Sequence, residues 1–315
     1  MTGNMEARIV SVSDAVIADA AMLLREGGLV AVPTETVYGL AARADSDEAV
    51  ASIYRAKGRP DFNPLIVHVT DLAQAERLAW FDDRARALAA RFWPGALTMV
   101  LPKRDDARLA AAVTAGLPTV ALRCPAHPAM RAVLAATGLP LAAPSANRSG
   151  GVSPTSAAHV AFSLGSRVDR ILDGGDCASG IESTIVALRA DGGWQLLRPG
   201  PITRDVLMDV LGAPDIAVSG DLIEAPGQLA SHYAPGKPVR LNACSAAADE
   251  FHIGFGDVAG DASLSPSGDL VEAAASLYAL LHMAAGARQP RIAIAPIPEN
   301  GVGIAINDRL RRAAV

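Results

Sequence analysis

Residues 55 to 59 place three cationic side chains directly ahead of an apolar segment. Gly58 allows the backbone to approach an anion closely, Lys57 supplies a point charge, and Arg59 supplies a planar fork that matches phosphate oxygens. The alternative is a solvated helix end, where the helix dipole favours cations. This segment alone leaves the two interpretations evenly balanced, whereas Arg55 fits the helix end better.

Further polar loops follow segments that are typical of strands, and residues 33 to 41 are interpreted as one of them. In open α/β sheets ligands gather where strands end, so we expect a binding site at these loops. Hydroxyl and amide groups donate to phosphate or sugar oxygens without adding charge, although each loop alone is also compatible with an ordinary polar turn. Together the loops favour an anionic small molecule. The hydroxyl and amide residues are Thr34, Thr36, Ser145, Asn147, Ser183 and Thr184.

Three basic residues lie inside or at the end of apolar segments. His68 lies within LIVHV, where a histidine is more often a core residue than a ligand or a base. Arg123 ends TVALR and needs an anionic partner, which either a substrate carboxylate or a structural Asp or Glu would provide. Arg198 ends WQLLR, ahead of a Pro-Gly turn.

Several kinds of chemistry are excluded or disfavoured. The sequence contains no GxxxxGK[ST], GxGxxG, GxSxG or HExxH motif. The three cysteines have no CxxC spacing, which favours a reducing compartment over a zinc site or disulfides. A net charge of −5 argues against a broad nucleic-acid-coating surface. The N-terminus is charged and no apolar run reaches about 18 residues, so we expect a soluble, cytoplasmic protein without a membrane partner.

Helix-like and strand-like segments alternate up to about residue 211. Residues 15 to 26 show helical spacing and end at a Gly-Gly pair, and residues 46 to 56 begin at a Ser-Asp N-cap. This alternation predicts the α/β class with a mixed sheet, and the close strand pair after residue 183 predicts an antiparallel edge. Further helices are predicted at 71–92 (two short ones), 128–136 and 155–165, and strands at 29–32, 64–69, 96–102, 119–125, 139–147, 170–175, 182–188 and 194–200.

The chain is predicted to divide into two domains. Residues 212–237 are rich in Pro, Gly and Ala without periodicity, which indicates a linker. Residues 1–211 then form the larger domain. Residues 238–315 form a small α/β domain with a strong amphipathic helix and a terminal helix.

The ordered segments VPTETVYGLA, YRAKGRPDFNPLIVHV, FWPGALTMVLP, APSANRSGG, GGDCASGIESTIV and LLRPGPIT resemble the YrdC-like threonylcarbamoyl-AMP synthases over about residues 10 to 205. The segments APGQLASHYAPGKP and GVGIAINDRLRRAA resemble the linker and the C-terminal end of the long form of that family. The resemblance implies a YrdC-like twisted mixed sheet with a concave basic face. It also implies a small Rossmann-like α/β C-terminal domain.

The family to which the resemblance points forms L-threonylcarbamoyladenylate and pyrophosphate from L-threonine, bicarbonate or CO2, and ATP. The product is handed to the machinery that makes threonylcarbamoyladenosine beside the tRNA anticodon. By resemblance, L-threonine would be bound by Thr36, His68, Arg123, Ala143 and Ser183. ATP would be bound by Lys57, Arg59, Asn63, Thr119, Ser145, Asn147, Ser153, Arg198 and Tyr233. Mg2+ is expected to enter with the ATP phosphates, without protein ligands of its own.

Two other classes remain open at this point. A double-stranded-RNA-binding or ribosome-associated protein would use the basic face for a phosphate backbone, but net acidity and few aromatic residues count against it. Related carbamoyl-transfer modules occur in larger chains with zinc-finger-like cysteines, and this sequence has no such cysteines.

Overall fold

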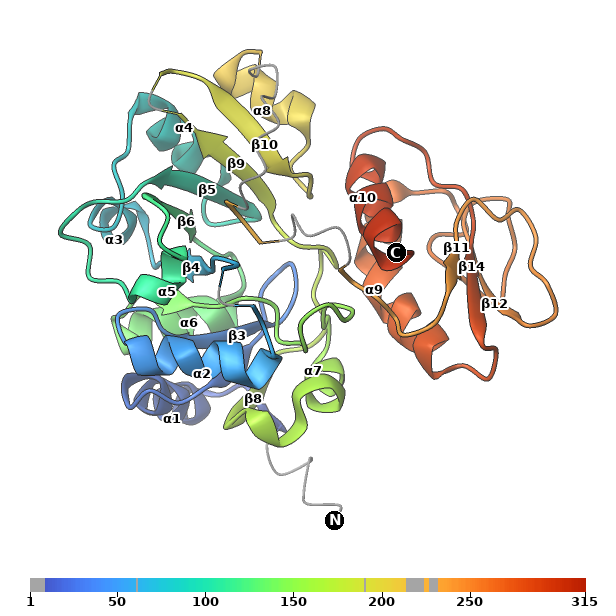
Figure 1. Ribbon diagram of the computed structural model, residues 1–315, viewed down its shortest axis with the longest axis horizontal. Coiled ribbons are helices and arrows are strands. Elements are labelled where there is room, and N and C mark those ends of the chain that lie inside the picture. Colours follow the sequence, from blue (N-terminus) through green and yellow to red (C-terminus); the bar gives the residue numbers. More distant parts are fainter. Residues whose placement is uncertain (1–8, 61, 190, 214–223, 227–231) are drawn as a thin grey trace.

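The structure is a computed structural model that describes residues 9–60, 62–189, 191–213, 224–226 and 232–315. Within these residues the strands form one sheet of ten strands and one of four, each with its own helices (Figure 1). We call them the larger unit and the C-terminal unit. No helix in the described part is long and apolar enough to cross a membrane.

The larger unit is built on a mixed sheet with the strand order β1-β8-β2-β3-β7-β4-β6-β5-β9-β10. β4 pairs in parallel with β6, and β5 with β9, whereas β9 and β10 are antiparallel. The predicted mixed α/β sheet and its antiparallel edge are therefore confirmed. The strands are β1 (Ile9–Ser11), β2 (Val30–Val32), β3 (Gly39–Arg43), β4 (Ile66–His68), β5 (Leu97–Pro102), β6 (Thr119–Arg123), β7 (Leu141–Ala142), β8 (Arg170–Asp173), β9 (Thr184–Leu188) and β10 (Trp194–Arg198).

Helix α2 of the larger unit begins and ends at residue types that favour helix termini. The α2 N-cap is Ser46, whose side chain accepts a hydrogen bond from the Ala49 N–H, and its C-cap is Gly58 with φ of 60°. This ending fixes Lys57 in the last turn, next to the polar loops. The helices are α1 (Asp14–Arg25), α2 (Asp47–Lys57), α3 (Leu72–Glu76), α4 (Asp83–Phe92), α5 (Ala111–Thr114), α6 (Pro128–Thr137), α7 (Ala157–Leu164) and α8 (Arg204–Leu211), followed after α7 by a 3-10 turn at Gly165–Arg167.

The interpretation of residues 33 to 41 as a polar loop was wrong at its C-terminal end, because β3 begins at Gly39. β3 consists of Gly, Leu, Ala, Ala and Arg, which have little intrinsic preference for strands. Two antiparallel neighbours, β2 and β7, stabilise it instead. A Cβ on Gly39 would lie 3.2 Å from the Ala143 Cβ, so the glycine allows a close approach to the loop after β7.

The C-terminal unit is a four-stranded sheet of order β11-β14-β12-β13, in which all pairs are parallel. Its two helices lie between this sheet and the larger unit (Figure 1). This parallel layer agrees with the predicted Rossmann-like arrangement. The elements are β11 (Val239–Arg240), β12 (Glu250–Gly254), β13 (Ala262–Ser263), α9 (Leu270–Gly286), β14 (Arg291–Ile294) and α10 (Gly303–Ala313).

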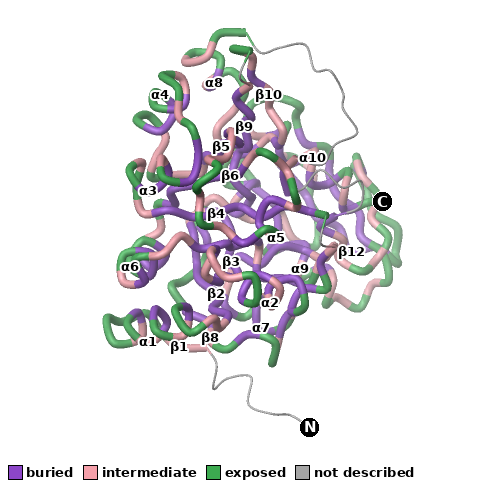
Figure 2. Tube along the Cα trace, turned by 60° about the vertical axis from the view of Figure 1, so that its left-hand side comes forward, coloured by how far each residue is buried: buried purple, intermediate pink, exposed green. Residues whose placement is uncertain are grey.

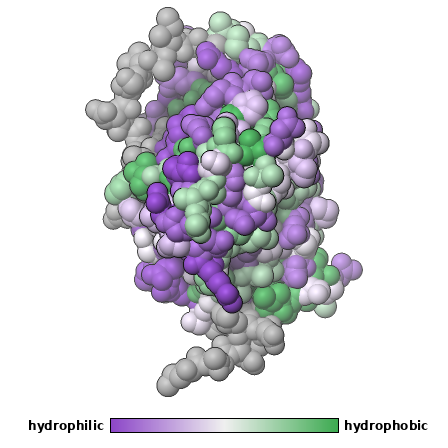
Figure 3. Space-filling model, turned by 90° about the vertical axis from the view of Figure 1, so that its right-hand side faces the viewer, coloured by the Kyte–Doolittle hydropathy of each residue, from purple (hydrophilic) through white to green (hydrophobic). Residues whose placement is uncertain are grey.

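The two units share a buried seam. Val37, Val152 and Ile181 of the larger unit belong to the same buried apolar cluster as Tyr278 of α9. Gly180 has φ of +68°, and a Cβ on it would lie 2.4 Å from the Ala274 carbonyl oxygen of α9, so the loop contacts the helix directly. Figure 2 shows the buried trace continuing between the two units, and Figure 3 shows a predominantly hydrophilic outer face on the C-terminal side. The apolar surface of the C-terminal helices is therefore turned inward.

The predicted linker is described only in part. Residues 214–223 and 227–231 lie outside the described residues. Within the described remainder, Glu224 accepts two hydrogen bonds from Arg189, and Pro226, His232 and Tyr233 lie at a cavity in the larger unit.

Candidate active site

A small cavity lies where the polar loops of the larger unit meet the segment between the two units. Its volume is about 40 Å³, counted as the space that the centre of a water molecule can occupy. All five residues predicted to bind threonine line it, together with four of the nine predicted to bind ATP. The lining residues are Thr36, Val37, Arg59, Ile66, His68, Arg123, Ala143, Pro144, Ser145, Glu182, Ser183, Arg198, Pro226, His232 and Tyr233.

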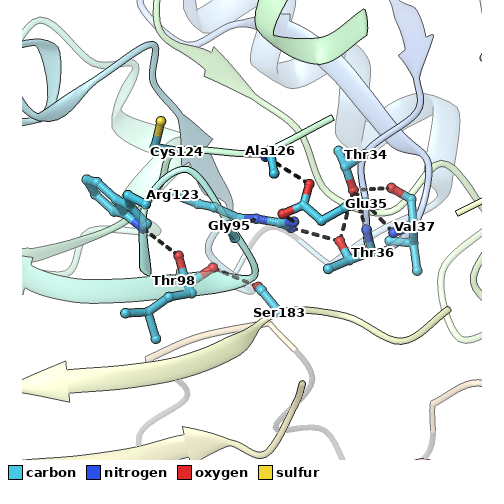
Figure 4. A network of polar contacts seen from close by, with 12 residues as sticks. Thr34, Glu35, Thr36, Val37, Gly95, Thr98, Arg123, Cys124, Ala126 and Ser183 are labelled. Atoms are coloured by element: carbon cyan, nitrogen blue, oxygen red, sulfur yellow. Dashed lines mark hydrogen bonds and ion pairs between the residues drawn. The ribbon is translucent and has the colours of Figure 1, made fainter. Parts of the chain in front are cut away.

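One wall of the cavity is the loop after β2, which is held by its own side chains. The Thr34 hydroxyl accepts hydrogen bonds from the N–H groups of Thr36 and Val37 and donates one to the Val37 carbonyl at 2.6 Å. This local turn directs the Thr36 side chain toward the end of β6 (Figure 4). Thr36 is fully buried, so its hydroxyl has a fixed position.

Arg123, at the end of β6, joins this loop to the sheet. Its Nη1 donates to the Thr36 hydroxyl at 2.9 Å, its Nη2 donates to Glu35 Oε1 at 2.6 Å, and its Nε donates to the Gly95 carbonyl at 3.2 Å (Figure 4). The other Glu35 oxygen accepts the Ala126 N–H. The sequence is compatible with either a substrate or an acidic residue as the anionic partner of Arg123, and in the structure Glu35 is such a partner.

This ion pair is largely shielded from solvent, with 4% of the Arg123 side chain and 16% of the Glu35 side chain exposed. Burial alone would raise the pKa of Glu35, but the charge and hydrogen bond of Arg123 hold that pKa below its ordinary value. Glu35 is thus ionised at neutral pH. Three of the five N–H groups of Arg123 are occupied, which leaves one on each terminal nitrogen for a ligand.

His68 lines the same part of the cavity and is buried. Burial, and to a lesser extent the nearby Arg123 charge, lower the pKa of His68 to about 3, so the ring is neutral at neutral pH. Its Nδ1 has no hydrogen-bond partner among the described residues. A buried polar atom without a partner is costly, so this nitrogen is available to a polar ligand.

Two further guanidinium groups line the same cavity. Arg59 donates from Nε to the Asn63 carbonyl and from Nη2 to the Pro64 carbonyl at 3.0 Å. Arg198 donates from Nε to the Ser183 carbonyl at 3.0 Å and from Nη2 to the Ser183 hydroxyl at 3.1 Å. Burial lowers the pKa of Arg59 to about 10, yet the group stays charged at neutral pH. Two adjacent cations with free N–H groups suit a polyphosphate.

Lys57 does not line the cavity, although sequence analysis placed it beside Arg59. Its Nζ donates to the Ser145 carbonyl and, at 2.6 Å, to the Asn147 carbonyl. Burial and the neighbouring Arg59 lower the pKa of Lys57 well below its ordinary value. Lys57 therefore joins the end of α2 to the loop that carries Ser145.

Four other residues predicted to bind ATP also lie outside the cavity lining. Asn147 accepts the Ser145 hydroxyl at 2.6 Å, and its own amide is used within the same loop. The Asn63 side-chain oxygen is buried without a partner in the described structure, so it too is available to a ligand. Thr119 starts β6, at the opposite end of that strand from Arg123. The fourth residue, Ser153, donates to a carboxylate described next.

Sequence analysis did not single out Glu182 or His232, and both line the cavity. Glu182 accepts a hydrogen bond from the Ser153 hydroxyl at 2.6 Å. Burial would raise the pKa of Glu182, but the charges of Arg309 and Arg198 lower that pKa to about 2. Burial lowers the pKa of His232 to about 3, and its Nδ1 has no partner among the described residues. The acidic residue before β9 and the His-Tyr pair were the available signals in the sequence.

The site supports positioning and electrostatic chemistry rather than covalent catalysis. Burial raises the pKa of the Cys124 and Cys177 thiols, and neither cysteine lines the cavity. Within the described residues no group of three or more His, Cys, Asp or Glu side chains could hold a metal ion. What the cavity offers is one fork for a carboxylate, one pair of cations for phosphates, and neutral hydroxyl and imidazole groups in the same lining.

Known protein families match both units of the chain. The family model described as "Telomere recombination" matches residues 22–200, and the model described as "Threonylcarbamoyl-AMP synthase, C-terminal domain" matches residues 202–315. The threonylcarbamoyl-AMP synthase of Bacillus subtilis is 42% identical, with 97% of this chain and 94% of the relative covered. That of Pyrococcus abyssi is 39% identical, with 94% and 93% covered.

Solved structures agree with these similarities. The crystal structure of P. abyssi Sua5 complexed with L-threonine superposes with a TM-score of 0.88 at 36% identity, covering 97% of both chains. The E. coli YciO structure has a TM-score of 0.53 at 21% identity and covers 61% of this chain, which shows a shared fold for the larger unit. The similarity to Sua5 extends over both units.

Proposed function

The chain belongs to the threonylcarbamoyl-AMP synthase family, and we propose that its cavity binds L-threonine against Arg123 and ATP against Arg59 and Arg198. The enzyme forms L-threonylcarbamoyladenylate, the activated intermediate for threonylcarbamoyladenosine in tRNA. The observation that carries the assignment of residues is that Arg123, with N–H groups left for a carboxylate, lines the same cavity as two other buried cations, Arg59 and Arg198. The reactants must meet in one place, so separate anion-binding groups around one cavity suit the reaction.

L-Threonine is placed by its three polar groups. Its carboxylate takes the remaining N–H groups of Arg123, whose orientation Glu35 and Thr36 fix from the other side. Neutral His68 bonds through Nδ1 to the substrate hydroxyl or amine, and the Ser183 hydroxyl lies at the same cavity. The P. abyssi relative was solved with L-threonine, which supports this choice of ligand.

The reaction needs no enzyme nucleophile. The threonine amine takes up CO2 from bicarbonate to give a carbamate, a carbamate oxygen attacks the α-phosphorus of ATP, and pyrophosphate leaves as the bond to the β-phosphate breaks. Arg59 and Arg198 stabilise the charge that develops on the phosphate oxygens, and the lining residues hold the reactants in line.

Mg2+ enters with ATP as part of the substrate. The carboxylate among the described lining residues, Glu182, already accepts hydrogen bonds from Ser153, Tyr278 and Arg309. The cavity residues therefore fit an ion carried by phosphate oxygens better than one held in a protein cage. The ion would neutralise part of the phosphate charge.

We also propose the division of the chain and the fate of the product. Residues 1–211 form the catalytic domain, residues 212–237 the linker, and residues 238–315 the small C-terminal α/β domain. The adenylate is handed to an enzyme that transfers the threonylcarbamoyl group to tRNA, because a mixed anhydride of this kind hydrolyses unless it is consumed.

The test is pyrophosphate release from Mg-ATP by the full chain. Release should require both L-threonine and bicarbonate, and L-threonylcarbamoyladenylate should appear by mass spectrometry in equal amount. L-Valine and D-threonine serve as controls, because L-valine lacks the hydroxyl contact and D-threonine, inverted at both stereocentres, cannot present its three polar groups in the same arrangement. Pyrophosphate release that is independent of threonine would overturn the proposal, and RNA binding without ATP binding would favour the RNA-binding alternative.

A further inference from the structure

A buried polar cluster connects the C-terminal helices to the cavity wall. Glu182, in the loop before β9, accepts hydrogen bonds from the Ser153 hydroxyl at 2.6 Å, the Tyr278 hydroxyl at 2.8 Å and Arg309 Nε at 3.0 Å. Tyr278 lies on α9 and Arg309 on α10. The cluster thus contains one carboxylate of the larger unit and two donors of the C-terminal unit.

Arg309 is fully buried at this seam. Its Nη1 also bonds to Asp308 at 2.8 Å, and its guanidinium carbon lies 5.6 Å from the centre of the Tyr233 ring. Its Nη2 has no partner among the described residues. Glu182 and Tyr233 both line the cavity, so Arg309 contacts two of its wall residues from behind.

A buried ion pair is an unusual way to join two units. Desolvating both charges can cost more than their attraction returns, and an apolar contact of the same size is often as stable. Removing one partner alone is strongly unfavourable, because it leaves a buried charge uncompensated. The pair therefore contributes a defined geometry and a local charge balance rather than net adhesion.

That charge balance matters because Glu182 also interacts electrostatically with Arg198, one of the two cations of the nucleotide wall. With Arg309 in place, the carboxylate accepts hydrogen bonds from Ser153, Tyr278 and Arg309, none of which lines the cavity. Without Arg309, the uncompensated carboxylate would bind Arg198 and compete with phosphate for that guanidinium.

We propose that Arg309 is a positioning residue for this reaction: by neutralising and orienting Glu182, it keeps Arg198 available to ATP, so the C-terminal unit completes the nucleotide side of the active site. This inference rests on the proposed function of the cavity. It assigns to α10 a part in ATP binding although Arg309 itself lies outside the cavity lining.

The decisive comparison is a double-mutant cycle of Arg309→Met and Glu182→Gln in the full chain. Arg309→Met should raise the KM for ATP by about tenfold or more, as expected when a buried charge loses its partner. The KM for L-threonine should change much less than the KM for ATP, because Arg123 and Thr36 do not contact this cluster, although Ser183 is hydrogen-bonded to Arg198. The double variant carries neither charge and should recover most of the ATP affinity.

A matched control lies on the same helix. Arg311 pairs with Glu299 at the surface, where 57% of each side chain is exposed, so Arg311→Met should leave both KM values unchanged. If Arg309→Met does not fold, Tyr278→Phe removes one donor to Glu182 without removing a charge. It should then raise the KM for ATP a few-fold.

The outcomes separate the inference from the function on which it rests. A wild-type chain that releases no threonine-dependent pyrophosphate contradicts the proposed function. When the wild type is active, either of two results for the variants contradicts the inference. In the first, Arg309→Met (or Tyr278→Phe) leaves the KM for ATP unchanged or alters kcat and both KM values alike. In the second, the double variant is no better than Arg309→Met.

Discussion

The two sides of the cavity draw their residues from different parts of the molecule. The threonine side, formed by Thr36, His68 and Arg123, belongs to the ten-stranded sheet and the loop after β2. The nucleotide side also includes Tyr233 from the segment between the units, and Glu182, which α9 and α10 hold in place. One side is complete within a single unit, and the other depends on contact between two units.

The difference suggests that the two substrates bind under different conditions. A side that is fixed by its own hydrogen bonds can bind its ligand whatever the position of the rest of the chain. A side assembled from two units has its full affinity only when the units are in contact. We therefore expect variants on the two sides to separate threonine binding from ATP binding.

Arg59→Ala should have the largest effect. It removes one of two buried cations from the nucleotide side, so kcat/KM for ATP should fall by about a thousandfold. L-Threonine binding, measured by calorimetry without ATP, should stay within about threefold of wild type. Arg55→Ala, an exposed residue in the last turn of α2, four positions before Arg59, is the matched control and should be neutral. Equal losses of threonine and ATP binding in Arg59→Ala would show that the two sides are not independent.

Arg123→Ala should have the next largest effect, on the opposite side. It removes the carboxylate fork and leaves Glu35 without its cation, so kcat/KM for L-threonine should fall by about a hundredfold or more. ATP binding by calorimetry should persist. Arg123→Lys keeps the charge but not the fork, and should recover only part of the loss; full recovery would mean that charge alone, without bidentate geometry, selects threonine.

Lys57→Met distinguishes a residue that contacts phosphate from one that supports the loop. The structure directs Lys57 Nζ to two backbone carbonyls, so its removal should lower the free energy of unfolding by about 2–3 kcal/mol, measured in urea. Turnover should fall as well, because the Ser145 loop loses its support. Loss of ATP binding with unchanged stability would instead place Lys57 directly on the phosphates.

Much of the fold could be predicted because its signals are local. The caps of α2 at Ser46 and Gly58, and the close pair β9 and β10, depend on residues that are neighbours in the sequence. β3 could not be predicted, because its Gly-Leu-Ala-Ala-Arg segment becomes a strand only between β2 and β7. Its formation is a tertiary effect that overrides weak propensity.

The candidate site divides in the same way. Residue types and spacing were enough to select Arg59, Arg123 and Arg198 as anion-binding candidates. They were not enough to show that the neighbour of Arg123 is Glu35, 88 residues away, or that Glu182 is held by Arg309, 127 residues away. Such pairings depend on the packing of distant elements, which no local pattern records.

The smallest expected effect is a pH dependence that separates the two buried histidines of the cavity. His68 is enclosed by the sheet, whereas His232 belongs to the segment between the units. Burial lowers the pKa of each to about 3 in the folded state, below the ordinary value of 6.5. The unfolded chain therefore binds more protons between these values, so stability is complete above about pH 6.5 and decreases as the pH falls toward 3.

For a histidine that only global unfolding can expose, the loss at pH 5.5 is about 1.4 kcal/mol, and pH values above 5.5 largely avoid the titration of carboxylates. Urea unfolding between pH 7.5 and 5.5 should therefore show wild type losing about 1.4 kcal/mol more than His68→Asn. On the side assembled from two units, we expect loss of the contact between the units to expose His232 without unfolding the sheet, so His232→Asn should resemble wild type in this measurement.

The corresponding local signal is the Ala234 amide, which donates to the Gly150 carbonyl at 2.8 Å. Its hydrogen exchange, corrected for the intrinsic pH dependence, should accelerate on acidification in wild type but not in His232→Asn. Equal pH slopes in wild type and His68→Asn would mean that the threonine side opens as readily as the nucleotide side, and the distinction between a preformed and an assembled side would then fail.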